Sequence, residues 1–382
     1  MKIFVLNNYP ENSSTKRLVS TGEKRGHQVE VVPYNDLYLH LSDSPNGHDK
    51  IYQKGTKLDV KSCDAVIPRM GNNLNYGLYV LEHFVGNMKV PSTSSPDGLA
   101  TAANKFLTSQ KLSQEKVRIP KTIFAYKPES VDFLIDKVGG LPCIAKTVLG
   151  SQGVGVMILE TKLAANTTLE TLFKNDIEIN LQQFLEANGK DIRVIVVDNE
   201  VVVAMERTSN KGDFRANLSK GGAGRKIDLT QDEKEMAVKA AQAVGLGDFA
   251  GVDLIRAKEH TYCIEVNGNP GDGIIEITGV NYYENLYKML ENRHNNNNKK
   301  QQKAYTTTTE NSMELPKKLG EYALYGSVER HRLKYGEYRN VQPYLKITDS
   351  YTLGGYNHNL QWLYVDVENG KQYYLVNGEL VY

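Results

Sequence analysis

The sequence predicts a protein of mixed α/β and α+β class that ends in a small all-β module. Three features of the 382-residue chain indicate this. Apolar strand-like runs alternate with helical stretches over the first 90 residues, which favours an open parallel sheet. The middle of the chain has two pairs of strands joined by turns, at 193–205 and 251–267, which makes this part α+β. The tail has Asn-Gly turn signals between strand-like runs.

The N-terminal alternation begins with an apolar strand at residues 3–6. A helix is expected at 15–25 and a second strand at 29–32. A third, short strand is expected at 65–67, followed by a helix near 76–84. This order is typical of parallel strands that are joined by crossover helices.

Two helices are expected in the middle of the chain. Pro96 follows Ser95, and proline is tolerated at the first helical position, so one helix should run from there to Leu112. Thr230 and Glu233 form a capping box at the start of the other.

Charge and cysteine content argue against several classes of protein. The chain has 46 Lys and Arg against 45 Asp and Glu, and its net charge of +1 gives no case for a nucleic-acid or membrane-surface partner. No apolar run approaches the roughly 20 residues of a membrane helix, and the apolar start is too short for a signal peptide. The three cysteines are far apart and fit neither a disulfide framework nor a metal site. We therefore expect a cytoplasmic protein.

Composition changes near residue 292. Residues 292–318 contain runs of Asn, Lys, Gln and Thr with almost nothing to bury, which predicts a flexible linker. Residues 319–382 hold 11 tyrosines and the only tryptophan, and are expected to form the β module. These aromatic side chains either line a peptide-binding groove or form the core of the module. The rest divides into an N-terminal α/β domain at 1–95 and a second domain at 96–291.

A glycine-rich stretch is the first candidate site. Residues 150–155 read Gly-Ser-Gln-Gly-Val-Gly, and Lys146 precedes them. Such a turn lets backbone N–H groups approach phosphate oxygens closely. A glycine hairpin without a ligand is the alternative. The spacing matches neither a Walker A loop nor a dinucleotide-binding fingerprint, and the protein-kinase motifs are absent.

Three oxygen-bearing side chains form a candidate metal site. Glu265 and Asn267 are two positions apart on one predicted strand and project from one face, and the hairpin brings Asp253 beside them. Mg²⁺ prefers such oxygen ligands and completes its shell with water and phosphate. Carboxylates within apolar runs are unfavourable unless they are paired or bound to metal. Charged side chains that face water are the alternative.

Arginines in the middle of the chain are candidates for holding phosphate or carboxylate groups. Arg193, Arg207 and Arg215 occur in the same part of the chain as Asp191 and Asn217. A guanidinium group binds such anions through two parallel hydrogen bonds. The polar, glycine-containing stretch around Arg215 is typical of a substrate loop. Solvated arginines are the alternative.

The order of these motifs resembles that of the ATP-grasp ligases, and most closely the RimK group, which adds glutamates to the C-terminus of a ribosomal protein. The resemblance covers roughly residues 1–290 and does not include the tail. It rests on Lys16-Arg17-Leu18, Arg25-Gly26-His27, Asp64-Ala65-Val66-Ile67-Pro68-Arg69, Lys105, Lys146 with the glycine-rich stretch, Gln182-Gln183-Phe184-Leu185, Asp191-Ile192-Arg193, Gly212-Asp213-Phe214-Arg215-Ala216-Asn217, Ala250-Gly251-Val252-Asp253 and Glu265-Val266-Asn267-Gly268-Asn269-Pro270-Gly271.

The resemblance implies an ATP-grasp fold, in which two α+β lobes hold ATP between them. It also implies a role for each matching residue. Lys105 and Lys146 would bind the nucleotide phosphates, and the loop with Ser151, Gln152 and Gly153 would close over them. The other implied roles are adenine contact by the backbone of Gln183 and Phe184, ribose contact by Asp191, stabilisation of phosphate and developing charge by Arg193 and Arg215, with Ala216 and Asn217 beside them, and binding of Mg²⁺ or Mn²⁺ by Asp253, Glu265 and Asn267.

The implied reaction joins a carboxylate to an amine. ATP phosphorylates the carboxylate to an acyl phosphate, the amine attacks, and phosphate leaves, so the enzyme contributes mainly positioning and charge neutralisation. We expect an amino acid, glutamate or another, to be added to a peptide or protein C-terminus, with the β module recruiting this acceptor. The sequence leaves room for a homo-oligomer. A small-molecule amino-acid ligase and a non-catalytic ATP-binding interaction protein are the other hypotheses, and the intact phosphate and metal residues argue against the second.

The chain departs from the RimK pattern at three positions. Gln183 stands where that group usually has an acidic residue at the adenine hinge, and Thr208 where it commonly has the second of two arginines. Glu276 stands where it usually has a lysine. The last two changes lower the positive charge near the expected substrate site. ATP-dependent amide formation is unaffected by them, while the identity of the amino acid is left open.

Overall fold

The computed structural model of the chain divides into two units, residues 1–39 with 51–296, and residues 40–50 with 297–382. Among the described helices, none combines the length and apolar character that a membrane crossing needs. The finer division that the sequence predicts, at 95, 291 and 318, stays a prediction. The structure describes residues 1–41, 50–54, 56–58, 63–71, 74–126, 128, 130–148, 155–209, 222–310, 322–324, 341–346, 362–366, 372–376 and 379–381, with side chains up to Asn296.

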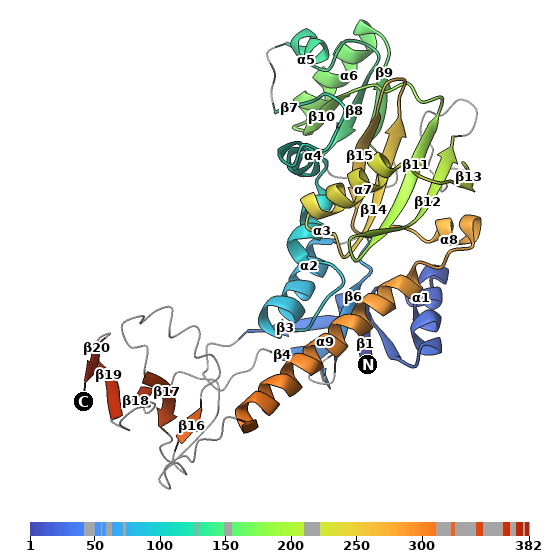
Figure 1. Cartoon of the computed structure of the whole chain (residues 1–382). Helices are drawn as coiled ribbons and strands as arrows, with labels where there is room; N and C mark the ends of the chain where they lie inside the picture. Colours follow the sequence, from blue (N-terminus) through green and yellow to red (C-terminus); the bar gives the residue numbers. More distant parts are fainter. Residues whose placement is uncertain are drawn as a thin grey trace. The chain divides into compact units, whose positions relative to one another are not determined.

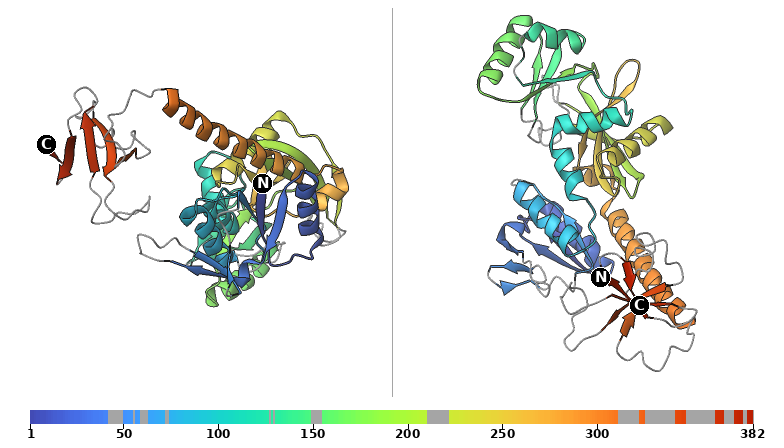
Figure 2. Two further views of the ribbon diagram at one scale, coloured as in Figure 1. Left: turned by 90° about the horizontal axis from the view of Figure 1, so that it is seen from below. Right: turned by 90° about the vertical axis from the view of Figure 1, so that its left-hand side faces the viewer.

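The N-terminal residues form an open parallel sheet with the strand order β2-β1-β6, as the sequence predicts. β1 (Lys2–Leu6) is central and pairs in parallel with β2 (Gln28–Val32) and β6 (Ala65–Pro68). α1 (Ser13–Lys24) connects β1 to β2 (Figure 2). The Asn12 side chain caps α1 by accepting a backbone N–H from its first turn.

Shorter elements follow in this part of the chain. β3, β4 and β5 form a second three-stranded sheet, and a single π-helical turn, η2, extends α2. Their bounds are η1 (Tyr34–Asp36), β3 (Leu37–His40), β4 (Lys50–Gln53), β5 (Thr56–Lys57), α2 (Leu74–Glu82) and η2 (His83–Asn87).

The helix predicted from Pro96 to Leu112 is two helices, and the single-helix prediction is wrong. α3 (Pro96–Ala103) starts at the predicted proline, and α4 (Lys105–Gln114) follows it. Asn104 between them has an extended backbone, and its side chain accepts the Phe106 and Leu107 N–H groups. Asparagine is a strong N-cap residue, so it ends one helix and starts the next, which sets the direction of Lys105.

A four-stranded antiparallel sheet, β7-β10-β8-β9, forms the smaller lobe (Figure 1). α5 and α6 cover one face, where alternate residues such as Cys143, Ala145, Ile179 and Leu181 form a core. Strand alternation therefore turns residues such as Lys146 to the other face. The bounds are β7 (Thr122–Ala125), α5 (Val131–Lys137), β8 (Cys143–Thr147), β9 (Val156–Leu159), α6 (Lys162–Lys174) and β10 (Ile179–Gln183).

The larger lobe is a five-stranded antiparallel sheet, β13-β12-β11-β14-β15. The two hairpins that the sequence predicts are its four neighbouring strands, β11 with β12 and β14 with β15. The bounds are β11 (Lys190–Val197), β12 (Glu200–Thr208), β13 (Ala223–Lys226), α7 (Gln231–Ala243), β14 (Phe249–Arg256), β15 (Thr261–Asn267) and α8 (Gly273–Thr278).

The two faces of the larger sheet differ in character. α7 covers one face with its buried alanines, against residues such as Val194, Val252 and Leu254 (Figure 1). The opposite face is apolar at one end, where residues such as Ile195 and Phe249 pack against the start of α9 and the N-terminal sheet. The other end of that face carries charged side chains and forms part of the candidate site.

The predicted linker differs from the structure over part of its length. The sequence predicts flexible chain over 292–318, but α9 (Tyr283–Glu310) continues through the first part of it. The composition of this segment indicates that few of its residues can be buried, but it does not exclude a helix. A helix that has begun gains one hydrogen bond for each residue that is added to it. The described tail segments form one antiparallel sheet of β16 (Tyr322–Leu324), β17 (Val341–Lys346), β18 (Trp362–Asp366), β19 (Gln372–Val376) and β20 (Glu379–Val381).

The predicted capping box is present on α7, and it allows a test of acid stability. Burial alone would raise the pKa of Glu233, but hydrogen bonds, led by that of Arg256, lower it to about 2. A carboxyl group whose pKa is lower in the folded state stabilises the fold above its unfolded pKa of about 4.5 and loses this effect as the pH falls towards 2. We expect Glu233→Gln to lower the free energy of unfolding at pH 7 by up to about 3 kcal/mol.

Urea unfolding at several pH values would measure this. The difference between Glu233→Gln and the wild type should shrink as the pH falls from 4.5 towards 2. Glu235→Gln, an exposed position on the same helix, is the control and should change little. A difference for Glu233→Gln that stays constant over this pH range would contradict the assignment.

Candidate functional site

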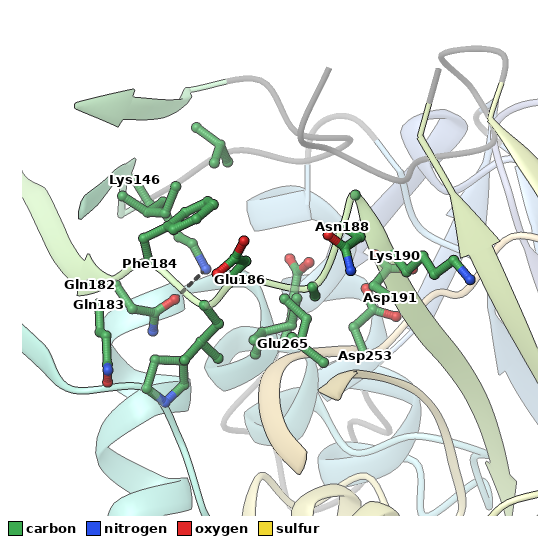
Figure 3. Close-up of a pocket in the computed structure, with 18 of the residues that line it drawn as sticks. Lys146, Gln182, Gln183, Phe184, Glu186, Asn188, Lys190, Asp191, Asp253 and Glu265 are labelled. Carbon is green, nitrogen blue, oxygen red and sulfur yellow. Dashed lines mark hydrogen bonds between the residues drawn. The ribbon is translucent and has the colours of Figure 1, made fainter. Parts of the chain in front are cut away.

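A cavity of about 380 Å³ lies between the smaller and the larger sheet (Figure 3). It is lined by α4, β8, β9, β10, the segment after β10, the start of β11, β14 and β15. Apolar walls with a few convergent charged groups are typical of a small-molecule or nucleotide site. The apolar lining includes Pro120, Ile144, Val156, Ile255 and Ile264, and the charged lining is Lys105, Lys146, Glu186, Lys190, Asp191, Asp253 and Glu265.

Lys146 is held by a chain of hydrogen bonds that crosses the smaller sheet. Its Nζ donates to Gln182 Oε1 at 2.7 Å (Figure 3). Gln182 Nε2 donates to Thr122 Oγ1 at 2.9 Å. Thr122 Oγ1 in turn donates to the Pro120 carbonyl at 2.9 Å. Gln182 is 4% exposed, so its amide has little freedom to rotate. Its position fixes where the ammonium group enters the cavity.

Two ammonium groups share one carboxylate in this cavity. Burial lowers the pKa of Lys105 and of Lys146, while the charge of Glu265 opposes the shift in both. The two lysines also repel each other, which lowers the pKa of Lys146 further. A phosphate group that enters between them would relieve this repulsion, since it adds negative charge.

The three predicted metal ligands come together. Asp253 and Glu265 are directly paired across β14 and β15, and Asn267 Nδ2 lies 3.4 Å from Asp253 Oδ2. Among the described residues no group of three His, Cys, Asp or Glu side chains gathers as a metal site, because the third predicted ligand is an amide. Two carboxylates and an amide oxygen are a donor set that fits Mg²⁺.

Two arginines hold the buried carboxylates of the larger sheet. Arg193 binds Asp253 through Nε and through Nη2, the latter at 2.8 Å. Arg207 binds Asp191 at 2.6 and 2.8 Å and also reaches Asp253 at 3.1 Å. Burial alone would raise the pKa of Asp253, but the two guanidinium groups hold it below its usual value. Burial raises the pKa of Asp191 in spite of Arg207.

These ion pairs give Arg193 and Asp191 partners that the sequence does not predict. Both were expected to face the nucleotide, and in the structure each is bound to a partner of opposite charge. Asp191 still lines the cavity. Asp253 receives Arg193 on both of its oxygens, and Arg207 and Asn267 on Oδ2, so a metal ion at this carboxylate would share it with these donors.

The predicted adenine hinge follows β10. Gln183 and Phe184 both line the cavity, as does Leu185. The Gln183 N–H donates to the Lys121 carbonyl at 2.8 Å, so adenine contact by the backbone of Gln183 and Phe184, which stays a prediction, would use their other backbone groups. Lys121 directly precedes β7, and this hydrogen bond extends the pairing of β10 with β7 by one residue beyond Gln182 and Thr122.

Several predicted residues lie outside the described part of the chain. These are the loop residues Ser151, Gln152 and Gly153, and the substrate-loop residues Arg215, Ala216 and Asn217. Glu276 is described and is bound to Arg17 at 2.9 Å.

Two residues of the site have partners that the sequence does not predict. Gln182 positions Lys146, and the signal for it was its place on the face of β10 opposite to the buried Leu181. Arg207 bridges two carboxylates; it was noted as a candidate but its partners were not. Arg207 lies directly opposite Asp191 of β11, and this pairing depends on the register of the hairpin.

Comparison with known proteins places the chain in a family. A family model described as the RimK PreATP-grasp domain matches residues 1–99, and one described as the RimK-like ATP-grasp domain matches residues 102–290. A protein of Enterobacter sp. (strain 638) named "Probable alpha-L-glutamate ligase" is 38% identical over 297 residues, 77% of this chain and 96% of the relative. One of the same name from Halorhodospira halophila is 39% identical over 282 residues, 73% of this chain and 91% of the relative.

Solved structures share the fold. ATP-grasp ligase PsnB complexed with minimal precursor, Mg and ADP has a TM-score of 0.61 at 18% identity, over 77% of this chain and 97% of that one. The macrocyclase MdnC from Microcystis aeruginosa, bound with its precursor peptide MdnA, has a TM-score of 0.60 at 14% identity, over 76% and 100%. D-alanine–D-alanine ligase from Bacillus anthracis has a TM-score of 0.54 at 18% identity, over 79% and 99%.

Fold and site together define an ATP-grasp ligase, an enzyme that forms carbon–nitrogen bonds. Within that class, the chain belongs to the RimK-like ATP-grasp family. Dependence on ATP and magnesium is general among such ligases.

The Gln182 relay leads to a prediction for nucleotide binding. Gln182→Leu removes the acceptor of Lys146 Nζ at nearly constant volume, so the ammonium group should lose its fixed position. We expect the Kd for ATP to rise about 10- to 100-fold, as for the loss of a hydrogen bond to a charged group. Thr122→Val, which breaks only the outer link, should have a smaller effect in the same direction.

Fluorescence titration with an ATP analogue would measure both Kd values. An unchanged Kd in Gln182→Leu would show that the relay does not position Lys146 for the nucleotide.

Proposed function

We propose that this protein is an ATP- and Mg²⁺-dependent ligase that joins an amino acid to a carboxyl group of a peptide or protein through an acyl phosphate. The pairing of Asp253 with Glu265 carries the proposal, because it occurs in a cavity that Lys105 and Lys146 also line. Two carboxylates for a divalent cation beside two ammonium groups form a suitable environment for a phosphoryl group in transfer.

The nucleotide would extend along this cavity. The apolar walls and the backbone after Gln183 would hold adenine, and Asp191 would lie near the ribose. Lys105 and Lys146 would neutralise the phosphate groups, with Gln182 keeping Lys146 in place. The loop residues Ser151, Gln152 and Gly153, and the segment with Arg215, Ala216 and Asn217, belong to the same proposal.

The metal would be held by Asp253, Glu265 and Asn267. It would neutralise phosphate charge during transfer to the acceptor carboxylate. Arg193, which is bound to Asp253, would share its guanidinium group with phosphate oxygens in this proposal. The amine nitrogen then bonds to the acyl carbon, the bond from that carbon to the phosphate oxygen breaks, inorganic phosphate leaves and the nitrogen loses a proton.

The relatives suggest which substrates to test first. The two similar proteins from Enterobacter and Halorhodospira carry the name of alpha-L-glutamate ligases, and the PsnB and MdnC structures contain precursor peptides. We therefore propose L-glutamate as the first amino acid to test and a peptide or protein carboxyl group as the acceptor.

Intact-mass spectrometry would test this activity. Candidate peptides and cell-extract proteins are incubated with the full-length protein, ATP, Mg²⁺ and a mixture of the twenty amino acids. A product that is heavier by one or more amino-acid residues, formed only with ATP, is expected. No mass increment in any acceptor, with ATP turnover on small molecules alone, would contradict the peptide-ligase function.

The metal carboxylates provide the sharpest mutational test. Asp253→Asn with Glu265→Gln should abolish turnover, because both proposed carboxylate ligands are removed. Loss of the Asp253 charge also leaves the buried Arg193 without the carboxylate that it binds and removes one of the two that Arg207 binds, which costs about 3–5 kcal/mol of stability. The ion pairs of both arginines are with Asp253 and not with Glu265, so Glu265→Gln alone should fold. This single variant keeps the test interpretable if the double variant does not fold.

Asp232→Asn, an exposed carboxylate on α7, is the matched control for turnover. ADP release would be measured over a range of Mg²⁺ concentrations. Wild-type turnover in a folded Glu265→Gln variant would remove this carboxylate from the metal site.

A shortened chain would test the proposed role of the tail. Residues 297–382 belong to a different unit from the site, so a chain that ends at Asn296 should keep its affinity for ATP. If the tail recruits the acceptor, the KM for the acceptor should rise at least several-fold while the KM for ATP stays constant. Equal acceptor KM values would remove the tail from substrate recruitment.

A further inference from the structure

Arg69 is a buried guanidinium group without a carboxylate partner. It follows β6, is 7% exposed, and lies over the rings of Phe249 and Tyr283 at 5.9 Å from each centroid. Its Nη2 donates to the Pro270 carbonyl at 3.0 Å, whereas Nη1 is buried and has no hydrogen-bond partner. Arg207, equally buried, binds two aspartates.

A second unsatisfied atom lies at the same junction. Asn269 Nδ2 donates to the carbonyl of Met70, the neighbour of Arg69, at 2.7 Å, while Asn269 Oδ1 is buried and has no partner. One donor and one acceptor are therefore unsatisfied where the end of β6 meets the loop after β15. Buried polar groups of this kind are rarely left unpaired in the functional state of a protein.

Space beside the junction is available for a ligand. Gly71 and Gly271 follow Met70 and Pro270, and both glycines are exposed. A Cβ built on either of them meets no atom within 4 Å. Because Arg69 Nη1 and Asn269 Oδ1 are shielded from solvent in this state, a ligand has to move the surrounding segments to reach them.

The junction lies on the side of the metal site that is opposite to the nucleotide cavity. Ile255, Asp253 and Gly251 alternate along β14 and so share one face, and the first two line the cavity. A Cβ built on Gly251 would lie 2.7 Å from Pro270 Cβ and 3.2 Å from Arg193 Nη1. The junction is therefore on the order of 10 Å beyond Asp253, since alternate strand residues are about 7 Å apart.

We propose that this junction binds the amino-acid substrate, with its α-carboxylate on Arg69 Nη1 and an N–H of its amino group on Asn269 Oδ1. The inference rests on the proposed ligase function and adds to it the site of the amine. Asn269 is two residues along the chain from the proposed metal ligand Asn267, so the amine would approach the acyl phosphate from the side of the metal site that is opposite to the nucleotide. A carboxylate would also give Arg69 Nη1 the hydrogen-bond acceptor that it lacks in this structure.

Binding measurements on the full-length protein would test the inference. Each of the twenty amino acids is titrated calorimetrically in the presence of Mg²⁺ and a non-hydrolysable ATP analogue. We expect at least one to bind the wild type, and Arg69→Gln to weaken it about 10- to 100-fold, as for a lost hydrogen bond to a charged group. The α-carboxamide of that amino acid should bind wild type and variant equally weakly.

Matched variants separate binding from structure. Asn269→Leu should weaken the same amino acid about 5-fold, as for a neutral hydrogen bond, and it serves as the second variant if Arg69→Gln does not fold. Arg17→Gln breaks ion pairs to Asp272 and Glu276 near the same loop, and should lower the Tm without changing amino-acid affinity.

The outcomes also separate this inference from the ligase function. If the wild type performs ligation but amino-acid affinity is equal in wild type and Arg69→Gln, the inference is overturned and the proposed function stands. The inference is likewise overturned if Arg69→Gln changes only the Tm, which is the result expected if a buried water and not a substrate pairs with Arg69 Nη1. A change in the acceptor KM alone would also overturn it. If the wild type neither ligates nor binds any amino acid, the proposed function fails and takes the inference with it.

Discussion

The site depends on the ion pairs of one buried carboxylate. Asp253 is 3% exposed in an otherwise apolar strand, where an unpaired charge would be strongly unfavourable. Arg193 and Arg207 make it tolerable, and Arg207 extends the network to Asp191 at the wall of the cavity. The same interaction keeps a negative charge beside the place where magnesium is proposed to bind. The same residues, Asp253 with Arg193 and Arg207, thus stabilise the fold without a ligand and keep a carboxylate in position for a cation.

One face of the larger sheet has two functions because its two ends differ in polarity. Its apolar end, with residues such as Ile195 and Phe249, packs with the N-terminal sheet and the start of α9 in a single core. Its charged end faces the cavity. Arg69 lies where these two ends meet, against the ring of Phe249, which explains how a guanidinium group is buried without a carboxylate. The N-terminal domain therefore contacts the catalytic sheet directly at the proposed substrate junction.

Much of this could be predicted because the signals were local. The alternation at the start of the chain, the hairpin turns and the capping box at Thr230 each depend on neighbouring residues, and each is present in the structure. The Asp253, Glu265 and Asn267 set was predictable too, since a hairpin and strand alternation suffice to bring it together. The break at Asn104 is not predicted, because its capping side chain interrupts a stretch that otherwise reads as one helix. The helix beyond residue 292 is not predicted either, because a helix that has already begun can continue through residues that bury little.

By itself, the sequence determined the order of elements, the family resemblance and the residue types available for phosphate and metal. Only the tertiary structure decided the partners of those residues. Arg193 and Asp191 are engaged with opposite charges, the Gln183 N–H belongs to a strand edge, and Gln182 holds Lys146. Arg69 meets its carbonyl partner 201 residues away. Contacts of that range depend on sheet register and on packing between domains, which no local pattern encodes.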